Sequence, residues 1–410
     1  MVPPTIATDK ESSFDLERIQ KELQERNLDG WLHYCFKGSD PVAMRILGLP
    51  AGKLASRRWF YFIPKEGEPI KLVHRIEMEE LDSLPGDKLV YLGYKELSER
   101  LQEIAGRSPG RRIAMQYSPE NAIPYVSRVD AGTLELVRQA GLEVVSSADL
   151  VQSFEAIWTE KQLASHMYAG EKLKAIVFEA FDEVRERLEK GGRLTEYDIQ
   201  CFIMRRFDEL GLTTYSPPIV AVNEHSGSPH YQPTKEIHSE IKKGDFLLLD
   251  IWAKQKDDAD AVYADITWTG YVGESVPAKY EEIFQIVRGG RDAALELVRK
   301  AARDGAPVKG YQVDDAAREF ISAKGYGQYF VHRTGHSIGT EVHGNGANMD
   351  NLETRDERLV LPGTCFSIEP GIYMDEFGVR SEIDVYFGGD DVIIAGEPIQ
   401  TEVIAIMKRK

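Results

Sequence analysis

The chain is poor in cysteine, and the arrangement of its cysteines excludes several kinds of site. Only Cys35, Cys201 and Cys365 occur in 410 residues, and they form no CxxC pair. An odd number of distant cysteines argues against a disulfide framework and against a thiolate metal site. We therefore expect neither disulfides nor a cysteine-bound metal.

The sequence also lacks long apolar runs. No run approaches the roughly 18 residues that a membrane-spanning helix needs. The N-terminal stretch MVPPTIATDKESSF has no apolar segment of the kind found in secretory signals. We therefore expect a cytoplasmic protein.

Basic residues are outnumbered by acidic ones. The chain has 67 Asp and Glu residues against 50 Lys and Arg residues, a formal net charge of −17. A surface with this balance repels the phosphates of nucleic acids and of anionic lipids. We expect no nucleic acid and no membrane among its partners.

A chain of 410 residues is too long for one ordinary core, which predicts two domains. The composition changes near residues 150–158 without a Pro- or Gly-rich linker, and we place the domains at 1–155 and 156–410. Helical periodicity predicts helices at residues 14–28, 134–140, 159–189, 195–210, 278–303 and 312–324. Short apolar or aromatic runs predict strands at residues 30–34, 59–64, 70–74, 88–94, 111–118, 142–147, 245–254, 261–272, 364–374, 379–387 and 401–407.

Four carboxylates interrupt runs that are predicted to be buried strands. They are Asp250 after FLLL, Asp265 in AVYADITW, Glu369 in CFSIEPGIY and Glu382 in VRSEIDVYF. A buried ionised carboxylate costs several kcal/mol unless it is paired. One such acid would be expected to face solvent or to form a salt bridge. Four of them, with few basic residues in the same runs, indicate compensation by metal ions, and two ions rather than one.

The stretch HRTGHSIGTEVHG contains His332, His336 and His343, three of the nine histidines of the chain. In a helix, the first two would lie on one face, as in a two-histidine zinc site. Gly335 and Gly339 disfavour a helix, and the Glu of the HExxH zinc motif is missing. In an extended strand the two side chains would be ~13 Å apart. We therefore expect only one of the two to bind metal.

These residues together resemble a known family, the pita-bread metallopeptidases, which include methionine aminopeptidase, aminopeptidase P, prolidase and the metal-free creatinase. The motifs, in family order, are Asp250, ADIT with Asp265, GHSIG with His336, SIEPGIY with Glu369 and VRSE with Glu382. By motif the resemblance covers about residues 155–410. It implies an α+β chain, with a C-terminal pita-bread (creatinase/aminopeptidase-like) fold and an N-terminal mixed α/β creatinase-like domain.

The resemblance implies a dinuclear metal site. Its five ligands would be Asp250, Asp265, His336, Glu369 and Glu382, with Asp265 and Glu382 bridging the two ions. Four carboxylates and one imidazole suit Mn²⁺ best, and Co²⁺, Fe²⁺ or Zn²⁺ are compatible. Two such ions lower the pKa of a bridging water, and the hydroxide attacks the amide carbonyl.

The resemblance also suggests which side chains act on the substrate. The candidate catalytic residues are Glu369, His343, His332 and His230. The candidate substrate-binding residues are His230, Arg333, His343 and Arg380. Glu369 would shuttle a proton, and the histidines would bind substrate or stabilise the tetrahedral intermediate. Arg380 would also help to neutralise the carboxylates, and Thr267 could add a hydrogen bond to them.

The spacing of the first two ligands departs from the family pattern. Asp250 and Asp265 are 15 positions apart, more than the family usually shows. The excess lies in KQKDDADA, a polar run typical of a hairpin tip, and makes Asp257, Asp258 and Asp260 rivals of Asp250. We favour Asp250 because it lies on the predicted buried strand.

The leading functional prediction is a metal-dependent hydrolase of Xaa-Pro peptides, either a dipeptidase or an aminopeptidase P-like enzyme, acting as a homodimer. Arg333 replaces a small residue of prolidase-like relatives, and VHGNGANMDN replaces their acidic, proline-bearing continuation. These differences leave open a same-fold metal enzyme that hydrolyses or eliminates a small non-peptide molecule. A non-catalytic binding scaffold is a third reading, which the complete ligand set disfavours.

Overall fold

The computed structural model describes residues 14–50 and 55–408. Residues 1–13, for which we predict no secretory signal, lie outside the described part. The described chain forms two compact units, which divide between Glu155 and Ala156. Each unit is described by itself below.

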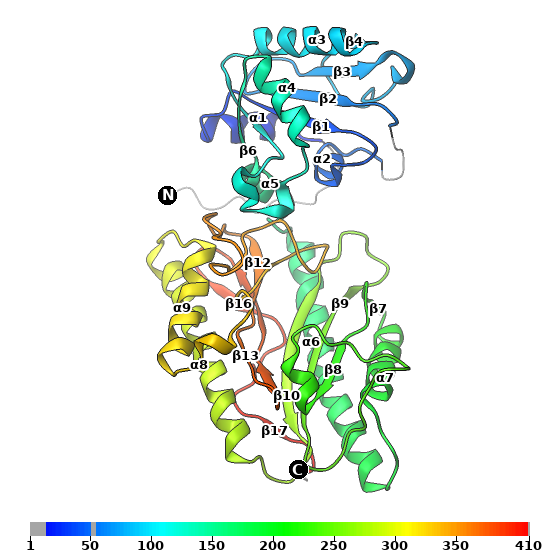
Figure 1. The fold of residues 1–410 in the computed structure, drawn as a ribbon, viewed down its shortest axis with the longest axis vertical. Coiled ribbons are helices and arrows are strands. Elements are labelled where there is room, and N and C mark those ends of the chain that lie inside the picture. The colour runs from blue at the N-terminus through cyan, green and yellow to red at the C-terminus, as the bar shows by residue number, and fades with distance from the viewer. Residues whose placement is uncertain (1–13, 51–54, 409–410) are drawn as a thin grey trace. The chain divides into compact units, whose positions relative to one another are not determined.

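The N-terminal unit is built on a six-stranded sheet of order β4-β3-β2-β1-β5-β6 (Figure 1). All pairings are parallel except those of β2, which runs antiparallel to both β1 and β3. The strands are β1 (Gly30–Cys35), β2 (Trp59–Pro64), β3 (Ile70–His74), β4 (Asp87–Tyr91), β5 (Arg112–Met115) and β6 (Glu143–Ser146). The helices are α1 (Leu16–Glu25), α2 (Pro41–Ile46), α3 (Tyr94–Arg107), α4 (Ala131–Gln139) and α5 (Ala148–Glu155). The mixture of helices and strands predicted for this region is confirmed.

The C-terminal unit contains two main sheets, the first of which includes a strand from the end of the described chain. One sheet has the order β17-β10-β9-β7, with β8 also paired to β9, and a second has the order β11-β12-β15-β16. The strands are β7 (Leu212–Thr213), β8 (Ile219–Val222), β9 (Phe246–Gln255), β10 (Ala264–Tyr271), β11 (Ser337–Ile338), β12 (Thr364–Ile368), β13 (Gly371–Tyr373), β14 (Gly378–Arg380), β15 (Ile383–Phe387), β16 (Val392–Ile394) and β17 (Ile404–Ala405). The α-helices are α6 (Glu160–Glu189), α7 (Glu196–Glu209), α8 (Ala278–Asp304) and α9 (Gly310–Ala323).

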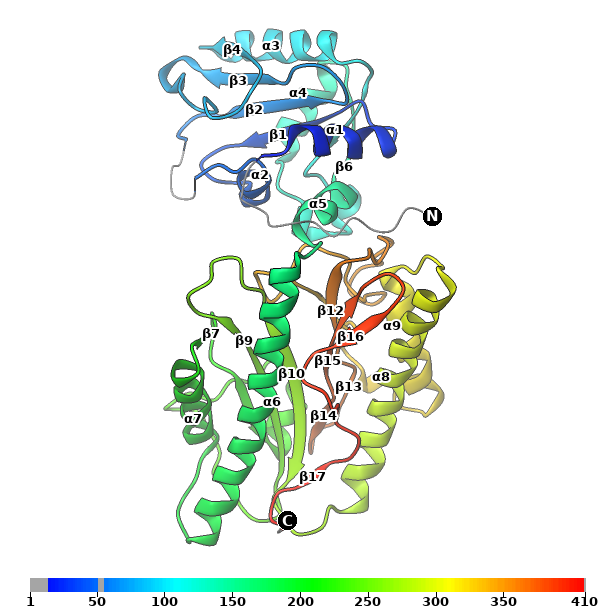
Figure 2. The same cartoon turned by 180° about the vertical axis from the view of Figure 1, so that it is seen from behind.

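Long helices cover the outer faces of these sheets (Figure 2). Helices α6 and α7 pack on β9 and β10 through a core that includes Val177, Phe181 and Leu249. Helices α8 and α9 pack on β12 and β15 through a separate core that includes Val287 and Phe366. The inner faces of the two sheets are therefore turned toward each other, and polar side chains between them are removed from water.

The starts of α6 and α7 show why these segments form helices. Thr159 caps α6, and its side chain and that of Gln162 form a reciprocal capping box. Thr195 and Asp198 form the same arrangement at the start of α7. Each box satisfies backbone N–H groups that the first turn of a helix leaves without partners.

The strands near the C-terminus differ from the prediction. Residues 364–374 and 379–387 were each expected to form one strand, but each is broken in two, and Glu369 and Glu382 lie at the breaks rather than inside strands. Pro370 has no N–H to continue a ladder after β12. At the second break, the backbone N–H of Glu382 bonds to the carbonyl of Thr267 rather than to a strand of its own sheet. The breaks turn both carboxylates toward the other half of the unit.

The predicted hairpin of β9 and β10 is confirmed, and its register places two acids on one face. Thr267 pairs with Asp250, and Asp265 pairs with Trp252. Because side chains two residues apart share a face of a strand, Asp250, Asp265 and Thr267 project to the same side. The polar residues KQKDDADA form the end of the hairpin, outside the ladder.

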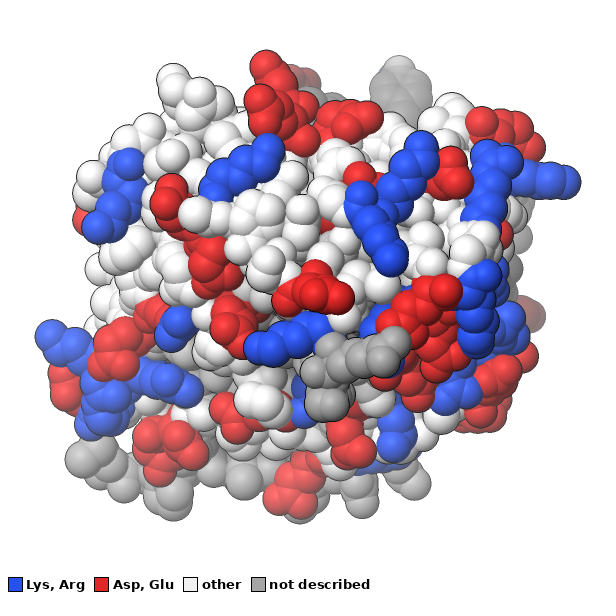
Figure 3. Space-filling model, turned by 90° about the horizontal axis from the view of Figure 1, so that it is seen from below, with Lys and Arg blue, Asp and Glu red and all other residues white. Residues whose placement is uncertain are grey.

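On the face of the molecule shown in Figure 3, basic and acidic side chains are interspersed.

In the described residues, no helix combines the length and the apolar character that crossing a membrane requires.

Candidate metal centre

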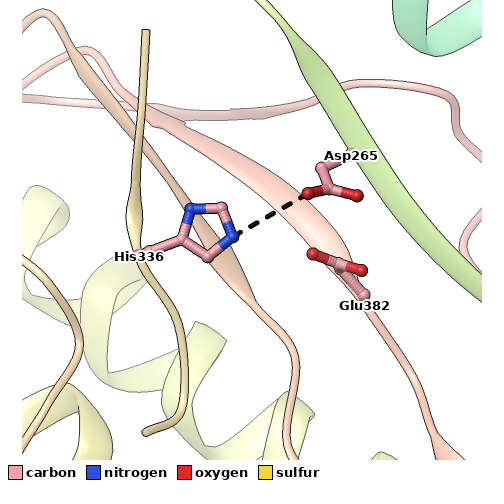
Figure 4. A group of neighbouring side chains, drawn as sticks. All are labelled: Asp265, His336 and Glu382. Carbon is pink, nitrogen blue, oxygen red and sulfur yellow. Dashed lines mark ion pairs between the residues drawn. The ribbon is translucent and has the colours of Figure 1, made fainter. Parts of the chain in front are cut away.

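Three of the predicted ligands meet in the C-terminal unit (Figure 4). Asp265 comes from β10, Glu382 from the break between β14 and β15, and His336 from the segment before β11. One ligand atom of each lies within 4.8 Å of the others, and all three residues are buried. Nε2 of His336 is 3.8 Å from Oδ2 of Asp265.

Glu369 extends this cluster on the side of His336. Its Oε1 lies 3.3 Å from Nε2 of His336. The hydroxyl of Ser367 holds the two in place, because it donates to Glu369 Oε1 at 3.1 Å and accepts from the backbone N–H of His336 at 3.0 Å. The sheet pairing of β11 and β12 thus sets the relative position of two predicted ligands.

Asp250 joins the cluster through Arg380. The guanidinium of Arg380 donates to Asp250, to the hydroxyl of Thr267 at 3.1 Å and to the hydroxyl of Tyr373 at 3.0 Å. Thr267 in turn donates to Glu382 at 2.7 Å. Arg380 is 3% exposed, and its guanidinium group donates these hydrogen bonds to buried side chains of the cluster. This geometry favours a neutralising and positioning role over the substrate contact that we also predicted for it.

The rivals of Asp250 lie elsewhere. Asp257 and Asp260 are exposed at the end of the hairpin, and Asp258 pairs with Lys161 at 2.9 Å. All five residues of the predicted ligand set therefore converge, and the three rival acids do not.

Burial and crowding strongly disturb the ionisation of these carboxylates. Burial, followed by the charge of Glu382, raises the pKa of Asp265 well above its usual value. Burial, followed by the charge of Glu369, does the same to the pKa of Glu382. Burial raises the pKa of Glu369 to about 7, although the positive charges of Arg380 and Arg333 oppose that shift. Without further positive charge, the cluster therefore favours protonated carboxyls.

The donor set fits divalent cations. Oδ1 of Asp250 and Oδ1 of Asp265 are buried and have no hydrogen-bond partner among the described residues. Such oxygens cost free energy unless they are protonated or bind a cation. Burial also lowers the pKa of His336 well below its usual value, which keeps its imidazole neutral and able to bind a metal. Carboxylate oxygens with one neutral imidazole are ligands that Mn²⁺ and similar ions accept.

His332 contacts Tyr373, whose hydroxyl also accepts from Arg380. Its Nδ1 lies 2.7 Å from the carbonyl of Arg333, and its Nε2 lies 2.7 Å from the Tyr373 hydroxyl. Because a carbonyl only accepts, Nδ1 carries the proton, and Nε2 accepts from the tyrosine. Burial lowers the pKa of His332 to about 3, in keeping with a neutral ring. His332 and His336 thus have different neighbours, and it stays a prediction that only one of the two binds metal.

The other predicted substrate residues surround the cluster. The ring of His343 is exposed and lies 4.3 Å from the ring of His336, between centroids. His230 is exposed in the loop after β8, near enough to interact electrostatically with His332 and His343. Arg333 is partly buried, and its charge acts on Glu369 and His336.

Sequence reasoning missed several residues of this site. Tyr373 links His332 to Arg380, and Asp384 accepts from the backbone N–H of Asp265 at 2.8 Å. Tyr215 is 68% exposed, yet lies near enough to Asp250 and Asp265 to sense their charges. Only Asp384 carried a signal, since it is one more acid in an apolar strand. A tyrosine in an apolar run looks like any core residue.

A comparison with family models identifies the class of this protein. The model of metallopeptidase family M24 matches residues 169–388. This region is more than half of the chain and contains all five residues of the predicted ligand set. The chain belongs to metallopeptidase family M24, and the predicted family is confirmed.

Several curated relatives of this chain are dipeptidases or probable dipeptidases. The chain is 28% identical to the Xaa-Pro dipeptidase of Lactobacillus delbrueckii subsp. lactis over 236 residues, 57% of this chain and 58% of that protein. It is 27% identical to the probable dipeptidase PepE of Mycobacterium tuberculosis over 277 residues, 67% of each chain. The match thus spans little more than half of the Lactobacillus relative.

Solved structures share the fold over nearly the whole chain. Dipeptidase PepE of Mycobacterium ulcerans superposes with a TM-score of 0.68 at 21% identity, covering 95% of this chain and 96% of that one. The prolidase of Pyrococcus furiosus gives 0.57 at 20% identity, covering 93% and 100%. These likenesses confirm the predicted pita-bread fold with an N-terminal mixed α/β domain.

Proposed function

We propose that this chain is a dinuclear metal-dependent hydrolase that cleaves Xaa-Pro dipeptides. The observation that carries the proposal is the convergence of His336 with four carboxylates in one buried cluster of an M24 chain. The substrate class is supported by the relatives, among which the Xaa-Pro dipeptidases of Lactobacillus delbrueckii subsp. lactis and Pyrococcus furiosus are 28% and 29% identical. We also infer a homodimer, which the molar mass in solution would test.

The metal ions would be held by the five clustered side chains. These are Asp250, Asp265, His336, Glu369 and Glu382. The oxygen-rich set favours Mn²⁺, with Co²⁺, Fe²⁺ or Zn²⁺ also compatible. When bound, two divalent cations supply an activated water and polarise the amide carbonyl.

Glu369 is the carboxylate best placed to move a proton. Its side chain is 16% exposed, against 11% for Asp250 and 7% for Asp265. It can therefore exchange a proton between water and the leaving nitrogen of the substrate, while Ser367 keeps its Oε1 in place. His343, exposed beside His336, is placed to contact the substrate and stabilise its reacting carbonyl oxygen.

Arg333 would anchor the free carboxylate of a dipeptide. Arg333 is partly buried and follows His332 in the sequence, and its positive charge interacts with Glu369 of the cluster. An arginine can bind a carboxylate through two parallel hydrogen bonds. A dipeptide places its C-terminal carboxylate one residue beyond the cleaved bond, whereas a longer peptide does not. The position of Arg333 therefore favours a dipeptidase over an aminopeptidase that acts on long chains.

The test is a comparison of three substrates with the Mn²⁺-loaded full-length protein. They are an Xaa-Pro dipeptide, its C-terminal amide and an Xaa-Pro tripeptide. We expect the free dipeptide to have the highest kcat/KM, and Arg333→Ser to raise KM for it roughly tenfold or more while changing the amide little. Asp265→Asn serves as the inactive control, since it removes a proposed ligand.

Two results would contradict the proposal at different levels. If no Xaa-Pro substrate is cleaved by protein that elemental analysis shows to contain metal, the peptidase function is wrong. If the tripeptide and the amide are cleaved as well as the dipeptide, the peptidase function stands, but the role given to Arg333 is wrong.

A further inference from the structure

The N-terminal unit contains a cavity of about 780 Å³ at the ends of several strands of its sheet. Strands β1, β3 and β4 run in the same direction and end there, and the antiparallel β2 begins there. The first turn of α4 closes the cavity. In open sheets of this kind, the carboxyl ends of parallel strands are the usual place of ligand sites. Neither the metal cluster nor the proposed peptidase function involves this cavity.

The wall of this cavity is basic, although the chain as a whole is acidic. Lys37, Arg57 and Arg58 line it, against the single carboxylate of Asp130. Among the residues that the structure describes, none of the three cations forms an ion pair with a carboxylate. The side chain of Arg57 donates to the carbonyl and the hydroxyl of its neighbour Ser56, both at 3.2 Å.

The one acid in the wall is already engaged. Asp130 accepts from the backbone N–H of Thr133 at 2.9 Å and from its hydroxyl at 2.8 Å, as the N-cap of α4. Three cations therefore face one carboxylate in the wall. Glu77, outside the wall, also interacts electrostatically with Arg57, but a surplus of positive charge remains. In a protein of net charge −17, such a local surplus is expected where an anion binds.

Aromatic side chains lie beside these cations. Tyr94 is 76% exposed and Phe36 is 40% exposed, and both line the cavity together with Tyr34 and Tyr91. The neighbouring Leu92 is also 52% exposed. Large apolar side chains gathered at an opening in this way indicate contact with a ligand rather than with water.

We propose that this cavity binds a small anion that combines a phosphate group with an aromatic ring, a nucleoside monophosphate being the simplest example. A phosphate monoester carries a charge of about −2 at neutral pH, which complements the surplus of positive charge in the wall. Arg57 and Arg58 offer guanidinium groups that can bind phosphate oxygens in pairs. The exposed rings of Phe36 and Tyr94 offer faces on which a base stacks. The cavity volume suits a ligand of this size, since such sites are roughly 300–1,000 Å³.

The proposal is tested by calorimetric titration of the full-length protein with AMP, adenosine and inorganic phosphate at low ionic strength. We expect AMP to bind at least roughly tenfold more tightly than either of its parts, and more weakly as salt is raised. The double substitution Arg57→Ala and Arg58→Ala should weaken AMP binding by roughly tenfold or more. Arg111→Ala is the matched control. Arg111 is exposed just before β5, at the end of the sheet where β1 and β5 begin, whereas the cavity lies where β1 ends.

Lys37→Ala provides a second test that does not depend on the folding of the double variant, since Lys37 is exposed. It should also weaken AMP binding, by roughly threefold to tenfold. The absence of AMP binding at millimolar concentration, or equal affinity in the wild type and in these variants, would overturn the site. Inorganic phosphate binding as tightly as AMP would overturn the aromatic part of the proposal.

Discussion

The most stringent prediction concerns Glu196, the first residue of α7. Its buried carboxylate accepts from the backbone N–H groups of Val222 at 2.8 Å and Ser239 at 2.6 Å. It also accepts from the hydroxyl of Tyr231 at 2.7 Å, and Nδ1 of His225 lies 3.0 Å away. One side chain thus holds four points of the chain, from Val222 at the end of β8 to Ser239 before β9.

The same segment carries His230, so the loss of Glu196 should affect both stability and catalysis. Hydrogen bonds to a charged group contribute roughly 1.5–3 kcal/mol each, and a buried donor without a partner costs about 1–3 kcal/mol. Glu196→Ala leaves two backbone N–H groups and one hydroxyl without their acceptor. Since part of this cost is relieved by water, we expect a loss of about 3–5 kcal/mol in the local free energy of opening. Glu196→Gln should lose about half of that, because the amide keeps one acceptor oxygen.

Hydrogen exchange is the suitable assay, because a chain with two units need not unfold in a single transition. A loss of 3 kcal/mol corresponds to exchange roughly a hundredfold faster, and the amides of Val222 and Ser239 should show it. Turnover should fall in parallel, while metal content should be unchanged. Glu240→Gln is the matched control, because Glu240 forms only surface ion pairs, with Arg193 and Lys242. Exchange within a factor of two of the wild type in Glu196→Ala would refute the reasoning.

Three further predictions concern metal binding and pH. His336→Ala should lose bound metal, whereas His332→Ala should keep it and lose turnover; equal metal loss in elemental analysis would contradict this division. Thr267→Val removes the hydroxyl that donates to Glu382 at 2.7 Å, and should weaken metal binding roughly tenfold in competition with a chelator; an unchanged affinity would exclude that role. Burial raises the pKa of Asp40 to about 7 from 3.8. As pH rises, this carboxyl therefore loses its proton at a lower pH in the unfolded chain than in the folded chain. Wild-type stability should therefore fall by on the order of 2–4 kcal/mol between pH 4 and pH 8. Asp40→Asn should lack this loss in thermal unfolding, and an identical pH profile would show that the carboxyl is not the cause.

Much of the fold could be predicted because the local signals agree with the final structure. Thr159 with Gln162 marks the start of α6, and the helix begins at Glu160. The apolar runs around Asp250 and Asp265 predict a hairpin, and all of β10 pairs with β9, from Ala264 to Tyr271. In such segments, capping and periodicity reflect interactions between residues that are close in sequence.

The remaining features depend on contacts between distant residues. The break at Glu382 follows from the bond of its backbone N–H to Thr267 in the other half of the unit, which no local pattern reveals. Glu196 looks like an ordinary acid in the first turn of a helix, where carboxylates are common. Its burial arises only when the segment after β8 folds over it. The basic cavity likewise combines residues from Lys37 to Asp130, which no window along the sequence brings together.

The predicted metal ligands are widely separated along the chain, which also affects how the protein folds during its synthesis. The bond between Thr267 and Glu382 spans 115 residues, and that between Asp250 and Arg380 spans 130. At about 5–20 residues per second, the ribosome delivers the second half of the site on the order of 10 s after the first. During that interval the apolar hairpin of β9 and β10 has no second sheet to cover it. Its two carboxylates then face water, where charged groups within an apolar strand hinder aggregation. The acids that we propose as metal ligands would thus first protect the nascent chain.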